Sequence, residues 1–290
     1  MSSSQQRPIL VATDLSARSD RALDRALQLA QSRQCNLAVL YVIESSWKDK
    51  FTTPRWSRPI ADVRELAQTR LQQILGAAAT QSGVNIELMV KEGNTVQAIQ
   101  EVAQSINAGL IITGVAREES LGRVLVGNTA EKLVRECDTP VLVVKQRPHR
   151  AYQQVVAATD FSTGAVCAAT SLAHLFPEAN LTVYHAFDFP RGTEDEPHVQ
   201  QAREAAKLKA QEFVTVCTQD TCLTDVNVEV HHGNVDQLLP VYCADNNVDL
   251  LVVGTHGLTG LLRTAIGSVA EQLLEHADCD VLIVRQTKEG

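Results

Sequence analysis

The feature that most constrains the fold is an internal repeat, because the same series of segments occurs twice in this chain of 290 residues. A chain of this length suggests about two domains of roughly 150 residues each. The repeat is of domain size, so it predicts tandem domains and excludes a solenoid. The matching segments are 13–16 with 159–162, 37–42 with 181–186, 92–94 with 232–234, Gly114 with Gly254, Gly127 with Gly267, and 141–144 with 281–284.

Within each half, short apolar runs alternate with stretches whose apolar residues recur at helical spacing. In the first half the runs 8–12, 36–42, 84–91, 110–113 and 140–144 predict strands, and helices are expected between them, the longest over 60–82. Strands that alternate with helices form a parallel sheet covered on both faces. We therefore expect two doubly wound, five-stranded parallel-sheet domains, over residues 1–147 and 152–290, with a short linker around 146–151.

One segment of the second half has the layout of a phosphate site. Gly254 and Gly257 follow the apolar run 249–253, and Gly267-Ser268 precedes a helical pattern over 269–276. Glycines allow close backbone approach to a ligand, and a helix amino end presents free N–H groups and a positive dipole end. The segment is neither a P-loop nor a dinucleotide-binding fingerprint. The alternative is that these glycines only turn the chain.

The spacing G-x2-G-x9-G-S resembles the nucleotide-binding signature of the universal stress protein family. His256 between the glycines and the run Ile266–Glu271 are also typical of that family. The resemblance extends over nearly the whole chain, once in each half. It implies the doubly wound fold described above, with ATP as ligand and Mg²⁺ as a possible companion. The residues expected to bind the nucleotide are Thr159, Asp160, Ala186, Gly254, His256, Gly257, Gly267, Ser268 and Val269.

The resemblance also assigns roles to these residues. Thr159 and Asp160 follow the first strand of the second half and are expected to contact adenosine, because a carboxylate and a hydroxyl can bond ribose hydroxyls or the adenine amine. Ala186, at the end of the next strand, is expected to contact the base through its backbone. The glycines, His256 and Ser268 are expected to line the phosphates. Asp160 could also cap the helix that follows it, and the two roles are compatible.

The first half departs from the signature. Arg117 stands where the family has its second glycine, Glu118 and Glu119 follow it, and Asn128 replaces the Ser or Thr after Gly127. A side chain at residue 117 hinders close backbone approach, and the two carboxylates would repel phosphate. We therefore expect a poor ATP site here, although Thr13, Asp14 and Val42 remain. The opposing interpretation is that Arg117 folds over the phosphates and compensates.

Composition narrows the possible partners and compartment. Lys and Arg number 26 against 34 Asp and Glu, a net charge of −8 without a basic stripe, which argues against nucleic acid. The sequence has no apolar run near the ~20 residues that span a bilayer and no signal-peptide core, so no membrane partner is expected. Seven scattered cysteines without a C-x-x-C pair fit the reducing cytoplasm. His185, His231 and His232 lack an assured third ligand, so no metal site is predicted.

The sequence thus predicts a cytoplasmic, ATP-binding stress-response module that acts on an unknown protein partner. The alternatives are a weak ATPase or nucleotidyl-transfer enzyme, and a scaffold without nucleotide. The expected site contains one carboxylate and no lysine, so we assign no catalytic residue and expect hydrolysis to be slow at most. The apolar closing runs 141–144 and 281–284 suggest that the halves pair as an intramolecular pseudo-dimer, with a further homodimer left open.

Overall fold

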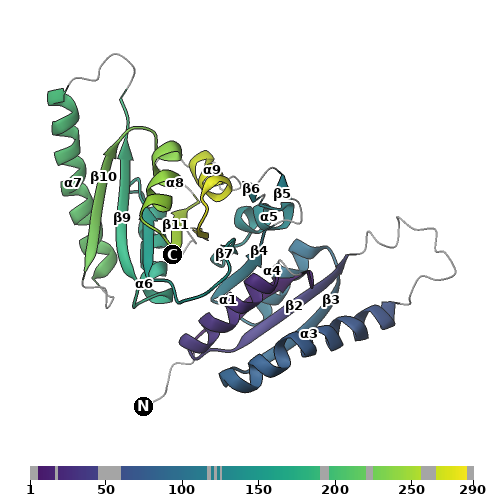
Figure 1. Cartoon of the computed structure of the whole chain (residues 1–290). Helices are drawn as coiled ribbons and strands as arrows, with labels where there is room; N and C mark the ends of the chain where they lie inside the picture. Colours follow the sequence, from purple (N-terminus) through teal and green to yellow (C-terminus); the bar gives the residue numbers. More distant parts are fainter. Residues whose placement is uncertain are drawn as a thin grey trace. The chain divides into compact units, whose positions relative to one another are not determined.

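The structure is a computed structural model that describes residues 6–16, 19–44, 60–115, 119–120, 123–124, 126–189, 196–219, 225–255 and 266–285. The chain divides into two compact units, one of residues 1–133 and 141–151, the other of residues 134–140 and 152–290. Strands alternate with helices along both (Figure 1).

The first half forms a parallel sheet in the order β3-β2-β1-β4-β7. Between β4 and the next helix along the chain, β5 pairs with β6 in a short antiparallel ribbon. The elements are β1 (Ile9–Thr13), α1 (Ser19–Ser32), β2 (Leu37–Glu44), α3 (Ile60–Ser82), β3 (Ile86–Gly93), α4 (Thr95–Ser105), β4 (Leu110–Gly114), β5 (Glu119–Ser120), β6 (Arg123–Val124), α5 (Asn128–Glu136) and β7 (Val141–Val144).

The second half repeats this plan in the order β10-β9-β8-β11-β12, again with parallel strands. The doubly wound parallel fold predicted from the repeat is thereby confirmed. The elements are β8 (Gln154–Ala158), α6 (Thr163–Leu175), β9 (Asn180–Phe187), α7 (Glu196–Thr218), β10 (Val226–His232), α8 (Val235–Asp245), β11 (Leu250–Gly254), α9 (Ser268–His276) and β12 (Asp280–Val284).

Helices cover both faces of the second sheet, as the apolar strands require. Val183 of β9 packs in a buried cluster with Ala165 of α6 and Phe213 of α7. The next residue, Tyr184, contacts Tyr242 of α8. Successive residues of a strand point to opposite faces, so α6 and α7 lie on one face and α8 on the other, where α9 packs against α8. We call these the α6/α7 face and the α8/α9 face.

The strand order places a topological switch point in the middle of the sheet. From β8 the chain passes to β9 on one side, and it later returns to β11 on the other side of β8. Ligands of such sheets bind outside the carboxyl ends of the strands at this point. The carboxyl ends of β8, β9 and β11 are therefore the region to inspect for a site.

Several predicted boundaries agree with the structure and others shift by one or two residues. The helix predicted over 60–82 is α3, whereas the strand predicted over 84–91 is found at Ile86–Gly93. Gly83 has φ +68°, a turn conformation that ends the helix and delays the strand. Residues 45–59, which include Trp47 and Trp56, lie outside the described residues.

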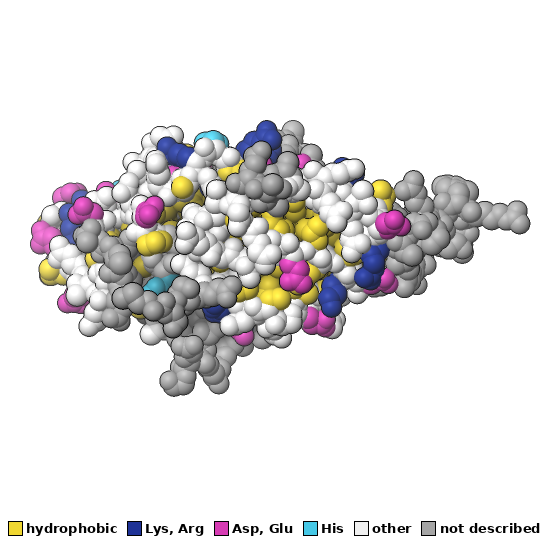
Figure 2. Space-filling view, turned by 90° about the horizontal axis from the view of Figure 1, so that it is seen from below, with side chains coloured by type: hydrophobic (Ala, Val, Ile, Leu, Met, Phe, Trp, Pro, Cys, Tyr) yellow, Lys and Arg dark blue, Asp and Glu magenta, His cyan; other side chains and the backbone are white. Residues whose placement is uncertain are grey.

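The surface carries both signs of charge and some apolar side chains. In the view of Figure 2, acidic and basic side chains are interspersed, and hydrophobic side chains reach the surface between them. Among the described residues, large exposed apolar side chains include Leu66 of α3 and Leu208 and Val216 of α7.

Candidate nucleotide site

The end of β8 is held in a tight loop by its own side chains. Thr159 is buried, and its Oγ1 accepts the N–H of Phe161 at 2.9 Å. Asp160 Oδ1 accepts the N–H of Ser162 at 3.0 Å. Phe161 between them has φ 64°, a left-handed conformation uncommon for an aromatic residue, which these two bonds stabilise. The loop thus directs the chain away from the sheet edge just before α6.

This geometry also answers the alternative role considered for Asp160. The N-cap of α6 is Ser162, whose Oγ accepts the N–H of Ala165 at 3.3 Å. Asp160 supports the loop one step earlier and does not cap the helix. An ionised carboxylate has about four acceptor positions. The Ser162 N–H uses one of these positions.

Gly254 has a packing reason to be glycine. It ends β11, which pairs with β8 through Val252 and Ala157. A Cβ at residue 254 would lie 2.9 Å from the carbonyl oxygen of Gly164, a distance that real Cβ atoms essentially never show. The absence of a side chain therefore lets the amino end of α6 approach the strand end. This role exists without any ligand.

Gly267 and Thr255 hold the two ends of the next segment together. The Gly267 N–H donates to the Thr255 carbonyl oxygen at 2.8 Å, and the Thr255 N–H donates to the carbonyl oxygen of Val284 at 3.1 Å. His256 and Gly257, two of the predicted phosphate residues, lie outside the described residues. The described part of the signature is thus a strand end joined directly to a helix start.

Among the described residues, no side chain caps the amino end of α9. Gly267 is its N-cap and has no side chain to accept an N–H, whereas Asn234 caps α8 with its own side chain. Ser268 is exposed, and so is Val269, at 39%. Free N–H groups and the positive dipole end make such a terminus suitable for an anion. Glu271 is the acidic residue of this first turn, so phosphate would need to lie toward Ser268.

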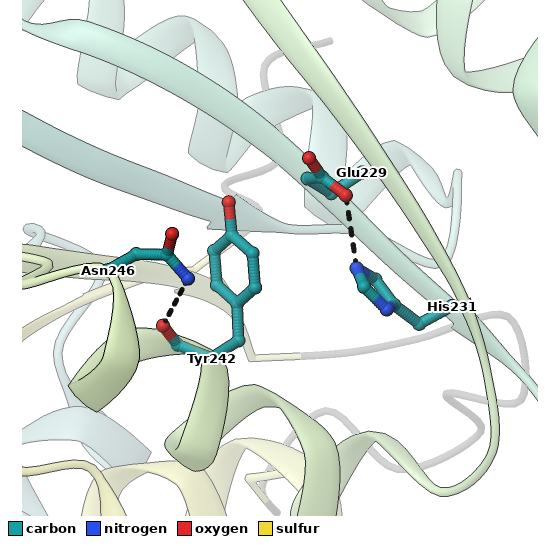
Figure 3. A network of polar contacts seen from close by, with 4 residues as sticks. All are labelled: Glu229, His231, Tyr242 and Asn246. Carbon is teal, nitrogen blue, oxygen red and sulfur yellow. Dashed lines mark hydrogen bonds and ion pairs between the residues drawn. The ribbon is translucent and has the colours of Figure 1, made fainter.

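Ala186 lies on the α8/α9 face beside a stacked aromatic group. It pairs in register with His231 of β10. The His231 ring stacks on Tyr184 with centroids 4.9 Å apart and 12° between planes, and its Nε2 lies 3.1 Å from Glu229 Oε2. Figure 3 shows the Glu229–His231 pair beside Tyr242, whose carbonyl oxygen accepts a bond from the Asn246 side chain. Burial is the main cause that raises the pKa of Tyr184 to about 12.

His185 lies on the opposite face from His231, because it pairs with Val230. Its Nδ1 is 2.8 Å from the Thr159 carbonyl oxygen, and its ring lies 4.3 Å from that of Phe161, centroid to centroid. Burial lowers the pKa of His185 below its usual value of 6.5. His185 and His231 therefore do not converge on one ion, and no group of three or more His, Cys, Asp or Glu suited to a metal occurs in the described part of the chain.

The first half repeats the strand-end loop with one difference. Leu15 has φ 60°, Thr13 Oγ1 accepts its N–H at 3.1 Å, and Asp14 Oδ1 accepts the Ser16 N–H at 2.9 Å. Here, however, Thr13 Oγ1 also lies 2.8 Å from the hydroxyl of Ser19, where the second half has Ala165. Arg117 and Glu118 lie outside the described residues, and Glu119 is in β5.

Sequence comparison identifies the family. The model of the universal stress protein family matches twice, over residues 6–145 and 151–285. The chain belongs to the universal stress protein family. The two matches cover most of both halves. The internal repeat of the sequence therefore consists of two universal stress protein domains in tandem.

Individual relatives agree with this assignment. A universal stress protein of Mycolicibacterium smegmatis is 24% identical, with 96% of each chain covered. Universal stress protein E of Photorhabdus laumondii is 23% identical over 71% of this chain and 70% of its own. Two solved structures share the fold: a putative universal stress protein of Pseudomonas aeruginosa, with a TM-score of 0.69, 22% identity and 96% and 93% coverage, and one from Archaeoglobus fulgidus, with a TM-score of 0.65, 17% identity and 98% and 100% coverage.

The described helices include none that is both long and apolar enough to span a bilayer.

Proposed function

We propose that this universal stress protein binds ATP in its C-terminal half and acts as a nucleotide-dependent stress-response module in the cytoplasm. The observation that carries the proposal is the hydrogen bond from Gly267 to Thr255, which joins the end of β11 to the uncapped start of α9. Phosphates placed there would meet backbone N–H groups of α9, and Gly267 itself adds no side chain. Mg²⁺ would be expected together with ATP.

The nucleoside would extend from this point across the carboxyl ends of β8 and β9. The Asp160 carboxylate would accept from ribose or the adenine amine. Ala186 lies on β9 two residues after Tyr184, the residue that pairs with the end of β8 at Ala158. His231 is the in-register neighbour of Ala186 and is 38% exposed. Its ring is held by Tyr184 and Glu229, so it can serve as a rigid stacking surface for the base. No pattern in the sequence indicates this role for His231.

Binding without efficient turnover follows from the same residues. Asp160 is the carboxylate expected at the site, and one of its oxygens already accepts the Ser162 N–H. No lysine is among the residues assigned to the phosphates. Phosphoryl transfer needs positioned charge and a water-orienting group. We therefore propose that hydrolysis, if measured, is slow compared with nucleotide release.

The cytoplasm is the proposed compartment because the described cysteines are free thiols, most of them buried in the core. We also propose that the halves associate within the chain. Each unit's own strand order ends in an apolar strand, β7 (Val-Leu-Val-Val) in the first and β12 (Asp-Val-Leu-Ile-Val) in the second. An apolar outer strand requires a cover.

Identification of co-purifying nucleotide tests the proposed function. The purified full chain is denatured and the released small molecules are separated by chromatography. We expect ATP at a substoichiometric to equimolar level. ADP produced over many turnovers would favour an enzyme, and a chain that neither carries nucleotide nor binds added ATP would contradict the proposal.

A further inference from the structure

A cavity of about 760 Å³ opens on the α6/α7 face of the second half. It lies between α7 and the carboxyl ends of β8 and β9, and the small side chains of Ala202, Ala205 and Ala206 on α7 leave it room. Its volume falls within the range of small-molecule sites. Ala186 and His231 belong to the other face, so the cavity is separate from the proposed base position. Of the predicted nucleotide residues, Asp160 borders it.

Aromatic rings form much of the lining, and they are braced against one another. Phe161 contacts Phe213 edge to face at 5.9 Å, and Phe187 contacts Phe189 in the same way at 5.9 Å. Phe213 is part of the buried core cluster, so one wall is rigid. Phenyl rings accept an apolar body edge-on or stacked and attract a cation over their faces.

The polar groups of the lining are mostly hydrogen-bond acceptors. Asp160, Asp188 and Glu212 contribute carboxylates. His185 adds an acceptor, because its Nδ1 must carry the proton that bonds the Thr159 carbonyl oxygen, which leaves a lone pair on Nε2. The lowered pKa of His185 keeps the ring neutral near pH 7. Lys209 is the one ammonium among the lining residues. It is exposed, as are Asp188 and Glu212, and its charge adds to burial in lowering the pKa of His185.

We propose that this cavity is a second ligand site, and that it takes a primary ammonium carried on an aromatic body, that is, an arylalkylamine. The rings would enclose the apolar body, and Asp188, Glu212 and His185 would accept the three N–H bonds of the ammonium, while Asp160 is left to the nucleotide. The excess of acceptors over donors rejects a carboxylate of the same shape. The site does not depend on ATP binding, because the two ligands use opposite faces of the sheet.

Calorimetry on the full chain tests the site with 2-phenylethylamine as probe and 3-phenylpropionate as the anion of similar shape. We expect one amine per chain and binding of the acid at least tenfold weaker. The variant Ala205→Phe fills the cavity from an exposed helix position and should weaken amine binding at least tenfold. Gln211→Phe, also exposed on α7 but outside the lining, should bind as the unaltered chain does.

Two further measurements test whether the carboxylates contribute to amine binding and whether the site is independent of ATP. Asp188→Asn with Glu212→Gln should weaken amine binding at least fivefold while circular dichroism stays unchanged. Saturating ATP should leave amine affinity within twofold. Equal binding of acid and amine, amine binding that survives Ala205→Phe, no amine binding at millimolar concentration, or displacement by ATP would each overturn the proposal. A chain that binds the amine but not ATP would contradict only the nucleotide proposal.

Discussion

The backbone N–H of Gly267 donates to the carbonyl oxygen of Thr255 at 2.8 Å, although the two residues are twelve positions apart in the sequence. Thr255 directly follows β11, and Gly267 is the N-cap of α9. A backbone hydrogen bond therefore links the strand end to the helix start. A side chain at residue 267 would crowd this bond, since a Cβ there would lie 3.3 Å from the Thr255 oxygen.

Gly254→Ala should destabilise the second half whether or not ATP is present. The new methyl group would lie 2.9 Å from the Gly164 carbonyl oxygen, so the amino end of α6 must shift. Overpacking of this kind costs about 1–3 kcal/mol. Thermal unfolding measures the loss.

Gly76→Ala is the matched control for that variant. Gly76 lies inside α3, and a Cβ there would have no neighbour within 4 Å. Alanine is the better helix former by about 1 kcal/mol, so this variant should be slightly more stable than the unaltered chain. A Gly254→Ala chain as stable as the control would refute the packing role of Gly254.

Stability of the second half should fall on acidification because of His185. Its folded-state pKa lies below the unfolded value of 6.5, so the unfolded chain binds the proton more readily. The stability linked to this group is present above pH 6.5 and decreases as the pH falls below it. Tyr41 is the residue of the first half that corresponds to His185, so we use the variant His185→Tyr. Its melting temperature should fall less between pH 7 and pH 5 than that of the unaltered chain.

The exposed His149 provides the comparison for the pH experiment. His149→Tyr should keep the pH profile of the unaltered chain. If the melting temperature falls equally between pH 7 and pH 5 in the unaltered chain and in His185→Tyr, His185 makes no contribution to the pH dependence of stability.

Much of this architecture could be predicted from the sequence. The repeat and the apolar runs gave the order of strands and helices, because parallel strands covered on both faces are recognisable as unbroken apolar segments. The helix over 60–82 was predicted with its observed bounds. The signature located the strand end at Gly254 and the helix start at Gly267-Ser268, since glycine and serine mark such ends locally.

Features that depend on contacts between distant segments could not be predicted. The need for glycine at residue 254 comes from Gly164 on another helix, and the N-cap role of Ser162 depends on the left-handed turn at Phe161. Which face a histidine occupies depends on strand register, so His185 and His231 could not be separated beforehand. The cavity beside α7 arises from the packing of that helix on β9 and has no local sequence signal.

His231→Ala should weaken ATP binding at least fivefold, about 1 kcal/mol, because a base loses its stacking surface. Tripolyphosphate, which has no base, should bind the variant and the unaltered chain equally, and calorimetry measures both. His232→Ala is the control, since His232 contacts Phe187 on the other face. ATP affinity that is unaffected by His231→Ala would exclude the stacking role.

Separate expression of the halves tests their association. Residues 1–147 and 152–290 each end their strand order in an apolar strand, β7 or β12, which we expect to be covered in the full chain. When mixed, the two pieces should form a complex, and alone each should self-associate. If sedimentation velocity shows two monodisperse monomers that do not associate when mixed, the pseudo-dimer is contradicted.

The central claim is that one ATP binds per chain, in the second half, and calorimetric titration tests it most directly. The matched variants are Ser268→Asp and Asn128→Asp, which add the same carboxylate to the first turn of α9 or α5. Acidic residues are tolerated at helix amino ends, so both variants should fold. We predict a stoichiometry of one, at least tenfold weaker binding, about 1.4 kcal/mol, for Ser268→Asp, and unchanged binding for Asn128→Asp. Two sites of similar affinity, or a loss confined to Asn128→Asp, would contradict the account.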